Sequence, residues 1–271
     1  MKKIATIARN TADSPNMTAN DAAILECITA ELQQRGAKVT CIGEDEEIPN
    51  DTHVVCTMSR TADIIERLRQ AEANGITVIN TTAAVENCSR KRFMEILHRN
   101  AIPQPPYHIV NCIDRLCEDC FPCWIKKADG WSNHSDDVTF ATTMQEAADA
   151  ICQMNARGIT ECIQMQHCTG DIIKFYGVGN EFFHYSYPGN GKFGKEAING
   201  APQHYSFDSG TLKHHAQGAA KAIGLDIYGG DAIITPQGEI YIIDMNDFPS
   251  FTAIRDIAAK EIATLIMNKT R

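Results

Sequence analysis

The feature that most constrains the fold is a regular alternation of strand-like and helix-like segments up to residue 80. Short apolar runs, typical of buried strands, alternate with longer stretches whose apolar residues recur at helical spacing. The strand-like runs are residues 3–8, 38–42, 53–57 and 76–80, and the helix-like stretches are residues 21–35 and 61–74. Gly36 and Gly75 follow these two stretches, as is typical where helices end. This alternation predicts a parallel sheet built from βαβ units.

A proline cluster marks a change of pattern. Pro103, Pro105 and Pro106 follow a helix-like stretch at residues 89–100. Strand-like runs dominate beyond them, at residues 123–127, 161–166, 172–178, 181–187, 227–235 and 239–246, with helices expected at residues 144–157, at about 211–223 and in a final stretch to residue 267. We therefore expect an α+β domain after the α/β one.

Composition excludes several classes of protein. The formal net charge of −9 and the lack of a long Lys/Arg stripe argue against a nucleic-acid partner. No apolar run approaches the length of a membrane span, and no signal-peptide pattern follows Met1, so a cytoplasmic protein is expected. The 11 cysteines are then expected to be reduced thiols.

The most informative stretch is the predicted hairpin at residues 230–246. If it closes symmetrically about Gln237-Gly238, Asp231 and Asp244 lie directly opposite each other, with Cβ atoms roughly 5 Å apart. Asn246, two residues after Asp244, shares their face of the sheet. Opposed carboxylates repel, and a hard divalent cation such as Mg²⁺ removes the conflict. The alternative is that the two aspartates are merely exposed residues at strand ends.

Asp231 and the later run Asp244-Met245-Asn246, followed by Phe248-Pro249, resemble the metal-binding end of the ATP-grasp superfamily, where an Asp precedes a Glu-x-Asn motif and a nearby Pro. Further segments resemble the family's other elements in the same order: residues 78–81 leading to Lys91, the linker at 102–105, the strand at 121–126 carrying Lys126, the hinge Gln164-Met165-Gln166, and the strand at 170–179. Together these cover residues from about 78 to 267.

The resemblance implies a fold of the carboxylate-amine ligase type, similar to the ATP-binding domain of glutathione synthetase. An N-terminal parallel α/β (pre-ATP-grasp) domain at residues 1–85 would precede an ATP-grasp domain at 86–271, with two α+β subdomains at about 86–160 and 161–271. The resemblance also implies the ligands ATP and Mg²⁺.

Specific residues acquire expected roles from the same resemblance. Nucleotide binding is expected of Lys91, Lys126, Gln164, Met165, Gln166, Lys174, Asp231 and Asp244, and metal binding of Asp231, Asp244 and Asn246. On a strand, Lys126 and Trp124 share one face, so this lysine can face a cleft. Lys174 lies among apolar strand residues, where a lysine is expected to have an anionic partner. Lys174 and Arg255 are the expected catalytic residues, with Arg9 and Arg60 as further candidates for the acceptor site.

The chain also departs from the family pattern. Asp244 stands where Glu is usual, and the expected phosphate-covering loop at residues 128–137 has one glycine, where the family often has several. Residues 189–195 match a phosphate-binding loop weakly, because Glu196 stands where that motif requires Ser or Thr. The spacing of Cys117, Cys120 and Cys123 is typical of a metal site, but Cys123 also begins a core strand.

The expected function is a Mg²⁺-dependent ligase that joins a small-molecule carboxylate to an amine through an acyl phosphate, converting ATP to ADP and phosphate. Two alternatives stay open: a small-molecule kinase of the inositol-polyphosphate type, which shares this fold, and a non-catalytic nucleotide-binding protein. We expect no membrane and no nucleic-acid partner, and a homodimer is left open.

Overall fold

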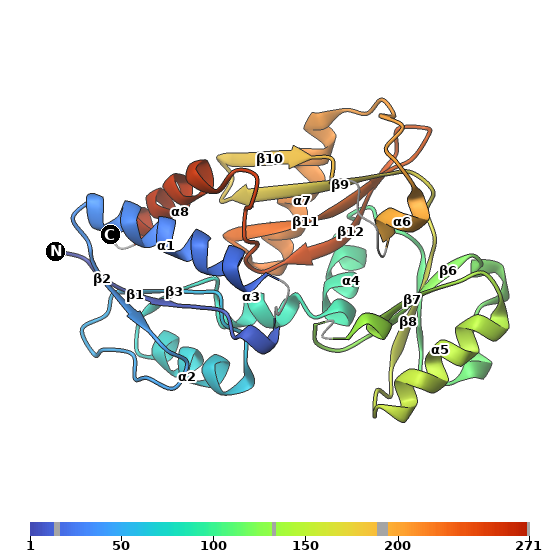
Figure 1. Ribbon diagram of the computed structural model, residues 1–271, viewed down its shortest axis with the longest axis horizontal. Coiled ribbons are helices and arrows are strands. Elements are labelled where there is room, and N and C mark those ends of the chain that lie inside the picture. Colours follow the sequence, from blue (N-terminus) through green and yellow to red (C-terminus); the bar gives the residue numbers. More distant parts are fainter. Residues whose placement is uncertain (14–16, 132–133, 189–194, 270–271) are drawn as a thin grey trace.

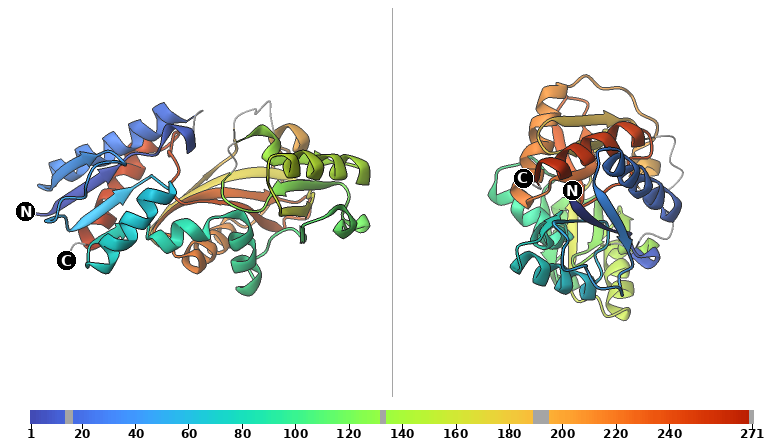
Figure 2. Two further views of the ribbon diagram at one scale, coloured as in Figure 1. Left: turned by 90° about the horizontal axis from the view of Figure 1, so that it is seen from below. Right: turned by 90° about the vertical axis from the view of Figure 1, so that its left-hand side faces the viewer.

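The computed structural model describes residues 1–13, 17–131, 134–188 and 195–269. Over these residues the chain forms three four-stranded sheets, one parallel and two antiparallel. The molecule is elongated, with the parallel sheet and both termini at one end (Figures 1 and 2). Within the described ranges, no helix combines the length and apolar character needed to cross a bilayer.

The parallel sheet has the strand order β2-β1-β3-β4 and is covered on both faces. Its strands are β1 (Lys3–Ile7), β2 (Lys38–Ile42), β3 (Val54–Thr57) and β4 (Thr77–Ile79), and the nearby helices are η1 (Thr11–Asp13), α1 (Thr18–Gln34), α2 (Ala62–Ala73) and α3 (Thr82–Asn87). Helix α1 packs against one face together with the C-terminal helix α8 (Arg255–Lys269), whereas α2 covers the other. Figure 1 shows α8 lying beside α1, although the two are at opposite ends of the chain.

The first antiparallel sheet has the strand order β5-β8-β6-β7. Its strands are β5 (Tyr107–Val110), β6 (Cys123–Lys127), β7 (Val138–Ala141) and β8 (Cys162–Gln166), and its helices are η2 (Ile113–Arg115), η3 (Glu118–Cys120), η4 (Ser135–Asp137) and α5 (Met144–Ala156). Thr143 and Glu146 form a reciprocal cap at the start of α5, which satisfies backbone N–H groups that the helix leaves unpaired. Helix α5 then packs its apolar face on one side of this sheet.

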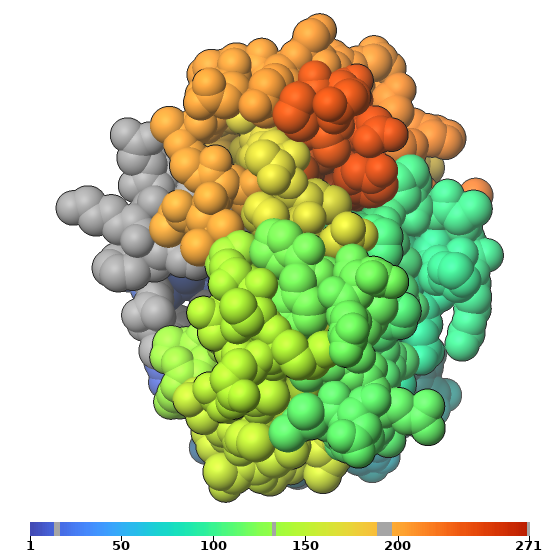
Figure 3. Space-filling model, turned by 90° about the vertical axis from the view of Figure 1, so that its right-hand side faces the viewer, coloured from blue at the N-terminus to red at the C-terminus, as the bar shows by residue number. Residues whose placement is uncertain are grey.

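The second antiparallel sheet has the strand order β10-β9-β11-β12. Its strands are β9 (Asp171–Val178), β10 (Phe182–Ser186), β11 (Ile227–Ile234) and β12 (Ile240–Asn246), and the accompanying helices are α4 (Arg90–Arg99), α6 (Lys195–Asn199) and α7 (Ser209–Ile223). The largest apolar core joins α4 and α7 to this sheet and to one face of the first antiparallel sheet. Figure 3 looks onto the end far from the termini, where green residues of the segment that forms the first antiparallel sheet lie below yellow, orange and red residues of the later segments.

The predicted parallel sheet and the later strand-rich pattern are confirmed, with element bounds shifted by a few residues. The short elements that were not predicted include α3, β5 and β7. The division at residue 85 stays a prediction. Helix α8 lies in the predicted ATP-grasp domain but packs against the N-terminal parallel sheet, since its apolar residues share one core with α1 and that sheet.

A buried asparagine links the parallel sheet to the second antiparallel sheet. Asn80, which is 1% exposed, follows β4. Its Nδ2 donates to the Ile227 carbonyl at 2.7 Å and to the Asp247 carbonyl, while its Oδ1 accepts from the backbone N–H of Asp226 at 2.8 Å and of Ile227 at 2.9 Å. One side chain therefore holds the start of β11 and the segment after β12 against the end of β4.

We expect Asn80→Ala to lower the free energy of unfolding by about 3 kcal/mol, because it leaves several buried backbone groups without partners. Asn87→Ala is the matched control: its Nδ2 makes one bond, to the Ile223 carbonyl at 3.0 Å, and its loss should cost about 1 kcal/mol. Urea unfolding of both variants measures the difference. Equal destabilisation by the two substitutions would contradict this role for Asn80.

Candidate functional site

Asp231 on β11 lies directly opposite Asp244 on β12. The predicted pairing is confirmed, but the predicted closure of the hairpin is not. Ile234 pairs with Ile240 and Ala232 with Ile242, so the turn closes one residue earlier than assumed. The register then shifts between Asp231 and Ala232, which makes Ile243 an extra residue on β12. This β-bulge brings the two carboxylates into opposition, two residue pairs before the open end of the ladder.

The strands approach closely beside the aspartates. A Cβ atom on Gly230 would lie 2.2 Å from the Asp244 carbonyl oxygen and 2.5 Å from the Phe175 ring. A Cβ on Gly229 would meet Pro249 at 2.8 Å. Any larger residue at these two positions would push β12 or the following segment away. The glycines therefore keep the carboxylate pair close to the loop after β12.

A cavity of about 490 Å³ opens beside this pair. Asp231 and Asn246 contribute to its wall, together with Lys174 on β9. Lys174 is paired with Asp231 across the β9–β11 ladder, and its Nζ lies 3.1 Å from Asp231 Oδ1. The expected anionic partner of Lys174 is confirmed, and the structure brings three predicted site residues to one cavity.

Two buried arginines from the parallel sheet complete the cavity wall. Arg9 follows β1 and Arg60 follows β3, at the carboxyl ends of adjacent parallel strands. Both pair with the buried carboxylate of Asp247: Arg60 Nη1 lies 3.4 Å and Arg9 Nη1 3.9 Å from Asp247 Oδ1. Arg9 Nε also lies 3.1 Å from Asp21 Oδ2. Burial lowers the pKa of the Arg60 guanidinium, and the charge of Asp247 counteracts this. The parallel sheet thus places two guanidinium groups beside the carboxylate hairpin.

Asp244 lines a smaller adjoining cavity of about 160 Å³. Arg60 and Asn246 line both cavities, so the two are neighbours. Arg90 and Trp131 also line the smaller one. The Arg60 guanidinium lies 4.6 Å from the centre of the Trp131 ring, a cation–π contact. Burial lowers the pKa of Arg90, and Asp244 counteracts this, which places Arg90 in the electrostatic field of the carboxylate pair.

Lys126 shares a face of β6 with Trp124, as expected from their alternation, and this face points toward the core between the two antiparallel sheets. The expected cleft beside Lys126 stays a prediction. Trp124 and Met165 pair across β6 and β8 and belong to the core that joins the two sheets. The Lys126 ammonium lies 3.6 Å from the Met165 sulfur, and the residue is 9% exposed. Lys126 and Met165 are therefore together on the face of the sheet that points toward β9 and β11.

The remaining predicted nucleotide residues lie elsewhere. The Gln164 side chain is on the opposite face of the sheet, where its Oε1 accepts from the Cys117 N–H and its Nε2 donates to the Cys117 carbonyl. Gln166 is two residues after Gln164 on β8, so the two side chains are on the same face of the strand. Lys91, at the start of α4, is paired with Glu161 at 2.7 Å. The predicted hinge of Gln164, Met165 and Gln166 therefore presents side chains to both faces of the sheet, because alternate residues of a strand face opposite sides. Its contact with a nucleotide stays a prediction.

Arg255 is also outside the two cavities, so far as the described residues define them. Its Nη2 donates to Asn20 Oδ1 at 3.1 Å, which links the start of α8 to α1. Within the expected phosphate-covering loop, His134 caps η4 by accepting from the Asp136 N–H. Residues 132–133 of that loop, and 189–194 of the weak phosphate-loop match, lie outside the described residues.

Comparison with solved structures gives extensive fold similarity at low sequence identity. D-alanyl-alanine synthetase A from Vibrio cholerae superimposes with a TM-score of 0.74 at 14% identity, covering 99% of this chain and 98% of that one. A RimK domain ATP-grasp protein from Sphaerobacter thermophilus gives 0.71 at 15%, covering 98% and 99%. The ATP-grasp ligase PsnB, complexed with a minimal precursor, Mg and ADP, gives 0.66 at 15%, covering 98% of each chain. The chain has the ATP-grasp fold.

No family model and no curated protein sequence matches the chain. The ATP-grasp fold is therefore established by three-dimensional similarity, at an identity too low to transfer a reaction.

Lys126→Met keeps the length of this side chain but removes its charge. If Lys126 contacts nucleotide phosphates, the variant should bind ATP about tenfold or more weakly, consistent with loss of a charged hydrogen bond worth about 1.5–3 kcal/mol. Lys127→Met is the control, because the neighbouring residue points to the other face of β6. Calorimetric titration of both variants with ATP and Mg²⁺ makes the comparison. Unchanged affinity in Lys126→Met would remove this lysine from the nucleotide site.

Proposed function

We propose that this chain is an ATP-dependent ligase that activates a substrate carboxylate as an acyl phosphate and transfers the acyl group to an amine. The observation that carries the proposal is the opposed pair Asp231 and Asp244, with Asn246, beside a cavity that also contains buried arginines. Similarity to ATP-grasp ligases, one of them solved with Mg and ADP, supports the same function.

The donor set of the hairpin fits Mg²⁺. Two carboxylates and an amide offer only oxygen ligands, which this ion prefers, and the opposed negative charges need a cation close by. Lys174 neutralises part of the charge on Asp231. We infer that Asp231, Asp244 and Asn246 hold the metal, which when bound neutralises charge on the nucleotide phosphates. Asp244 is one methylene shorter than glutamate, and the bulge at Ile243 lies directly before it.

Charge balance favours a carboxylate over a polyphosphate acceptor. Each cation that lines the larger cavity already has an acidic partner: Arg9 pairs with Asp21, Arg60 with Asp247 and Lys174 with Asp231. A polyphosphate would require several cations without such partners. A single substrate carboxylate can share the two guanidinium groups, and about 490 Å³ is room for a small molecule. The charges around the cavity therefore support the ligase over an inositol-polyphosphate type of kinase.

In the proposed reaction the chain mainly positions its substrates. Arg9 and Arg60 would orient the carboxylate toward the γ-phosphate, and Lys126 would hold the nucleotide phosphates from the first antiparallel sheet. Bringing the two anions together is the main barrier, so fixed cations and exclusion of water supply most of the rate enhancement. The carboxylate oxygen attacks the γ-phosphorus, ADP leaves, and an amine then displaces phosphate from the acyl phosphate.

Trapping with hydroxylamine tests this proposal. With ATP, Mg²⁺ and a panel of amino acids and small carboxylates, we expect ADP release that depends on a carboxylate, and a hydroxamate product when hydroxylamine is present. Asp244→Asn should reduce ADP release by about 100-fold, because a ligand of the metal is lost. Asp226→Asn, which removes a partly exposed carboxylate paired with Lys269, should keep activity near that of the wild type.

The product identifies the reaction class. A stable phosphate ester, found by mass spectrometry with the oxygen of the substrate hydroxyl retained, would contradict the ligase and favour the kinase.

The stability of the metal-free protein gives a separate test. Without metal, the melting temperature of Asp244→Asn should be no lower than that of the wild type, since the substitution relieves the carboxylate repulsion.

A further inference from the structure

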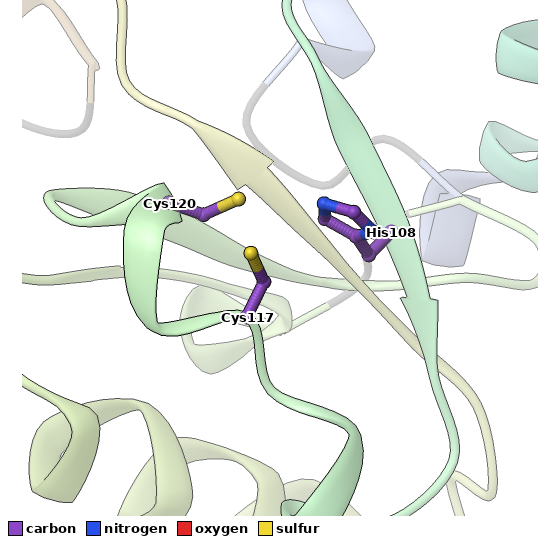
Figure 4. Close-up of side chains that lie close together, drawn as sticks. All are labelled: His108, Cys117 and Cys120. Carbon is purple, nitrogen blue, oxygen red and sulfur yellow. The ribbon is translucent and has the colours of Figure 1, made fainter.

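A second cluster of metal-binding side chains lies away from the carboxylate hairpin. His108 on β5, Cys117 just before η3, and Cys120 at its end bring their ligand atoms together, all within 4.8 Å of one another. Figure 4 shows the two thiols and the imidazole converging from a strand and the loop beside it. Around a tetrahedral Zn²⁺ ion, two thiolate sulfurs at about 2.3 Å from the metal would be roughly 3.8 Å apart. Small side-chain adjustments would therefore bring the three ligand atoms to metal-binding distances.

The cluster is held in place by Gln164, which is fully buried. Gln164 is paired with His108 across the β5–β8 ladder. Its Oε1 accepts from the Cys117 N–H at 2.8 Å and its Nε2 donates to the Cys117 carbonyl at 3.0 Å. The same residue therefore fixes the backbone of one cysteine and lies beside the histidine. Such partners, which orient the ligands of a metal, are typical of metal sites.

The cluster is distinct from the proposed nucleotide site. Val110, two residues after His108, belongs to the core under α5, together with Cys123 and Ile125. Trp124 and Met165 belong to the core on the other face of the same sheet. His108 therefore lies on the face opposite Lys126, by strand alternation. His108 is exposed, so an ion can approach the cluster from solvent on the side of β5.

We propose that His108, Cys117 and Cys120 bind one Zn²⁺ ion through two thiolates and one imidazole nitrogen, with water in the fourth position. Two sulfurs and a nitrogen are ligands that Zn²⁺ prefers, whereas Mg²⁺ prefers oxygen. Binding displaces one proton from each thiol, so two protons are released per ion. The ion would tie the edge strand β5 to the loop before β6, and its role would be to stabilise the first antiparallel sheet.

Zinc titration of the reduced, chelator-stripped full-length chain tests this proposal. In excess Mg²⁺ and without nucleotide, we expect one Zn²⁺ per chain in competition with a chromophoric chelator, and a thiolate-to-cobalt charge-transfer band when Co²⁺ is used instead. His108→Ala and Cys120→Ser should each weaken zinc binding by about tenfold or more. Cys152→Ser, which changes an exposed cysteine on α5, should bind like the wild type.

Melting temperatures and a hairpin variant locate the bound ion. Zinc should raise the melting temperature of the wild type and of Cys152→Ser but not that of His108→Ala, whose exposed position makes it compatible with the fold. Asp244→Asn should keep its zinc affinity, whereas loss of binding there would assign the ion to the carboxylate hairpin and overturn the proposal. A chain kept reduced that binds no zinc would also overturn it.

Discussion

The repulsion between Asp231 and Asp244 is the constraint to which the rest of the site responds. Paired strands gain stability from their ladder, yet this ladder sets two carboxylates opposite each other. The structure reduces the conflict with cations: Lys174 pairs with Asp231, and Arg90 lies in the field of Asp244. A divalent cation would remove the remainder, and its charge would then attract nucleotide phosphates. The same feature that weakens the hairpin thus suits it to a metal-dependent reaction.

The parallel sheet contributes to the site as well as to the fold. Arg9 and Arg60 reach the cavity because the carboxyl ends of β1 and β3 lie at its edge, where parallel sheets commonly bind ligands. Asp247, directly after the hairpin, pairs with both guanidinium groups. Asn80 accepts from and donates to the backbone around the same hairpin. Carboxylates, arginines and strand ends therefore form one connected network, so a change in the position of the sheet would alter the cavity.

Much of this could be predicted from the sequence, because long apolar runs and their spacing reflect local backbone geometry. The parallel sheet followed from alternation. Hairpin symmetry predicted the opposition of Asp231 and Asp244, although the turn closes one residue earlier and a bulge restores this pairing. The bulge itself could not be predicted, since Ile243 resembles any other buried strand residue. Strand β5 escaped prediction because it is short and follows a proline cluster. Of the two neighbouring cations on α4, the sequence favoured Lys91, and the structure places Arg90 in the field of Asp244, because the rotation of α4 depends on its packing. Likewise, only the partner strands decide that Met165 faces the inter-sheet core while Gln164 faces the cysteines.

The central claim, that the carboxylate hairpin is a metal site that recruits the nucleotide, can be tested by one binding measurement. Calorimetry would compare the affinity of a non-hydrolysable ATP analogue in excess Mg²⁺ with its affinity in EDTA. We predict clear binding with Mg²⁺ and binding weakened by about tenfold or more in EDTA, equivalent to about 1.4 kcal/mol or more. Equal affinity under the two conditions would contradict the metal site.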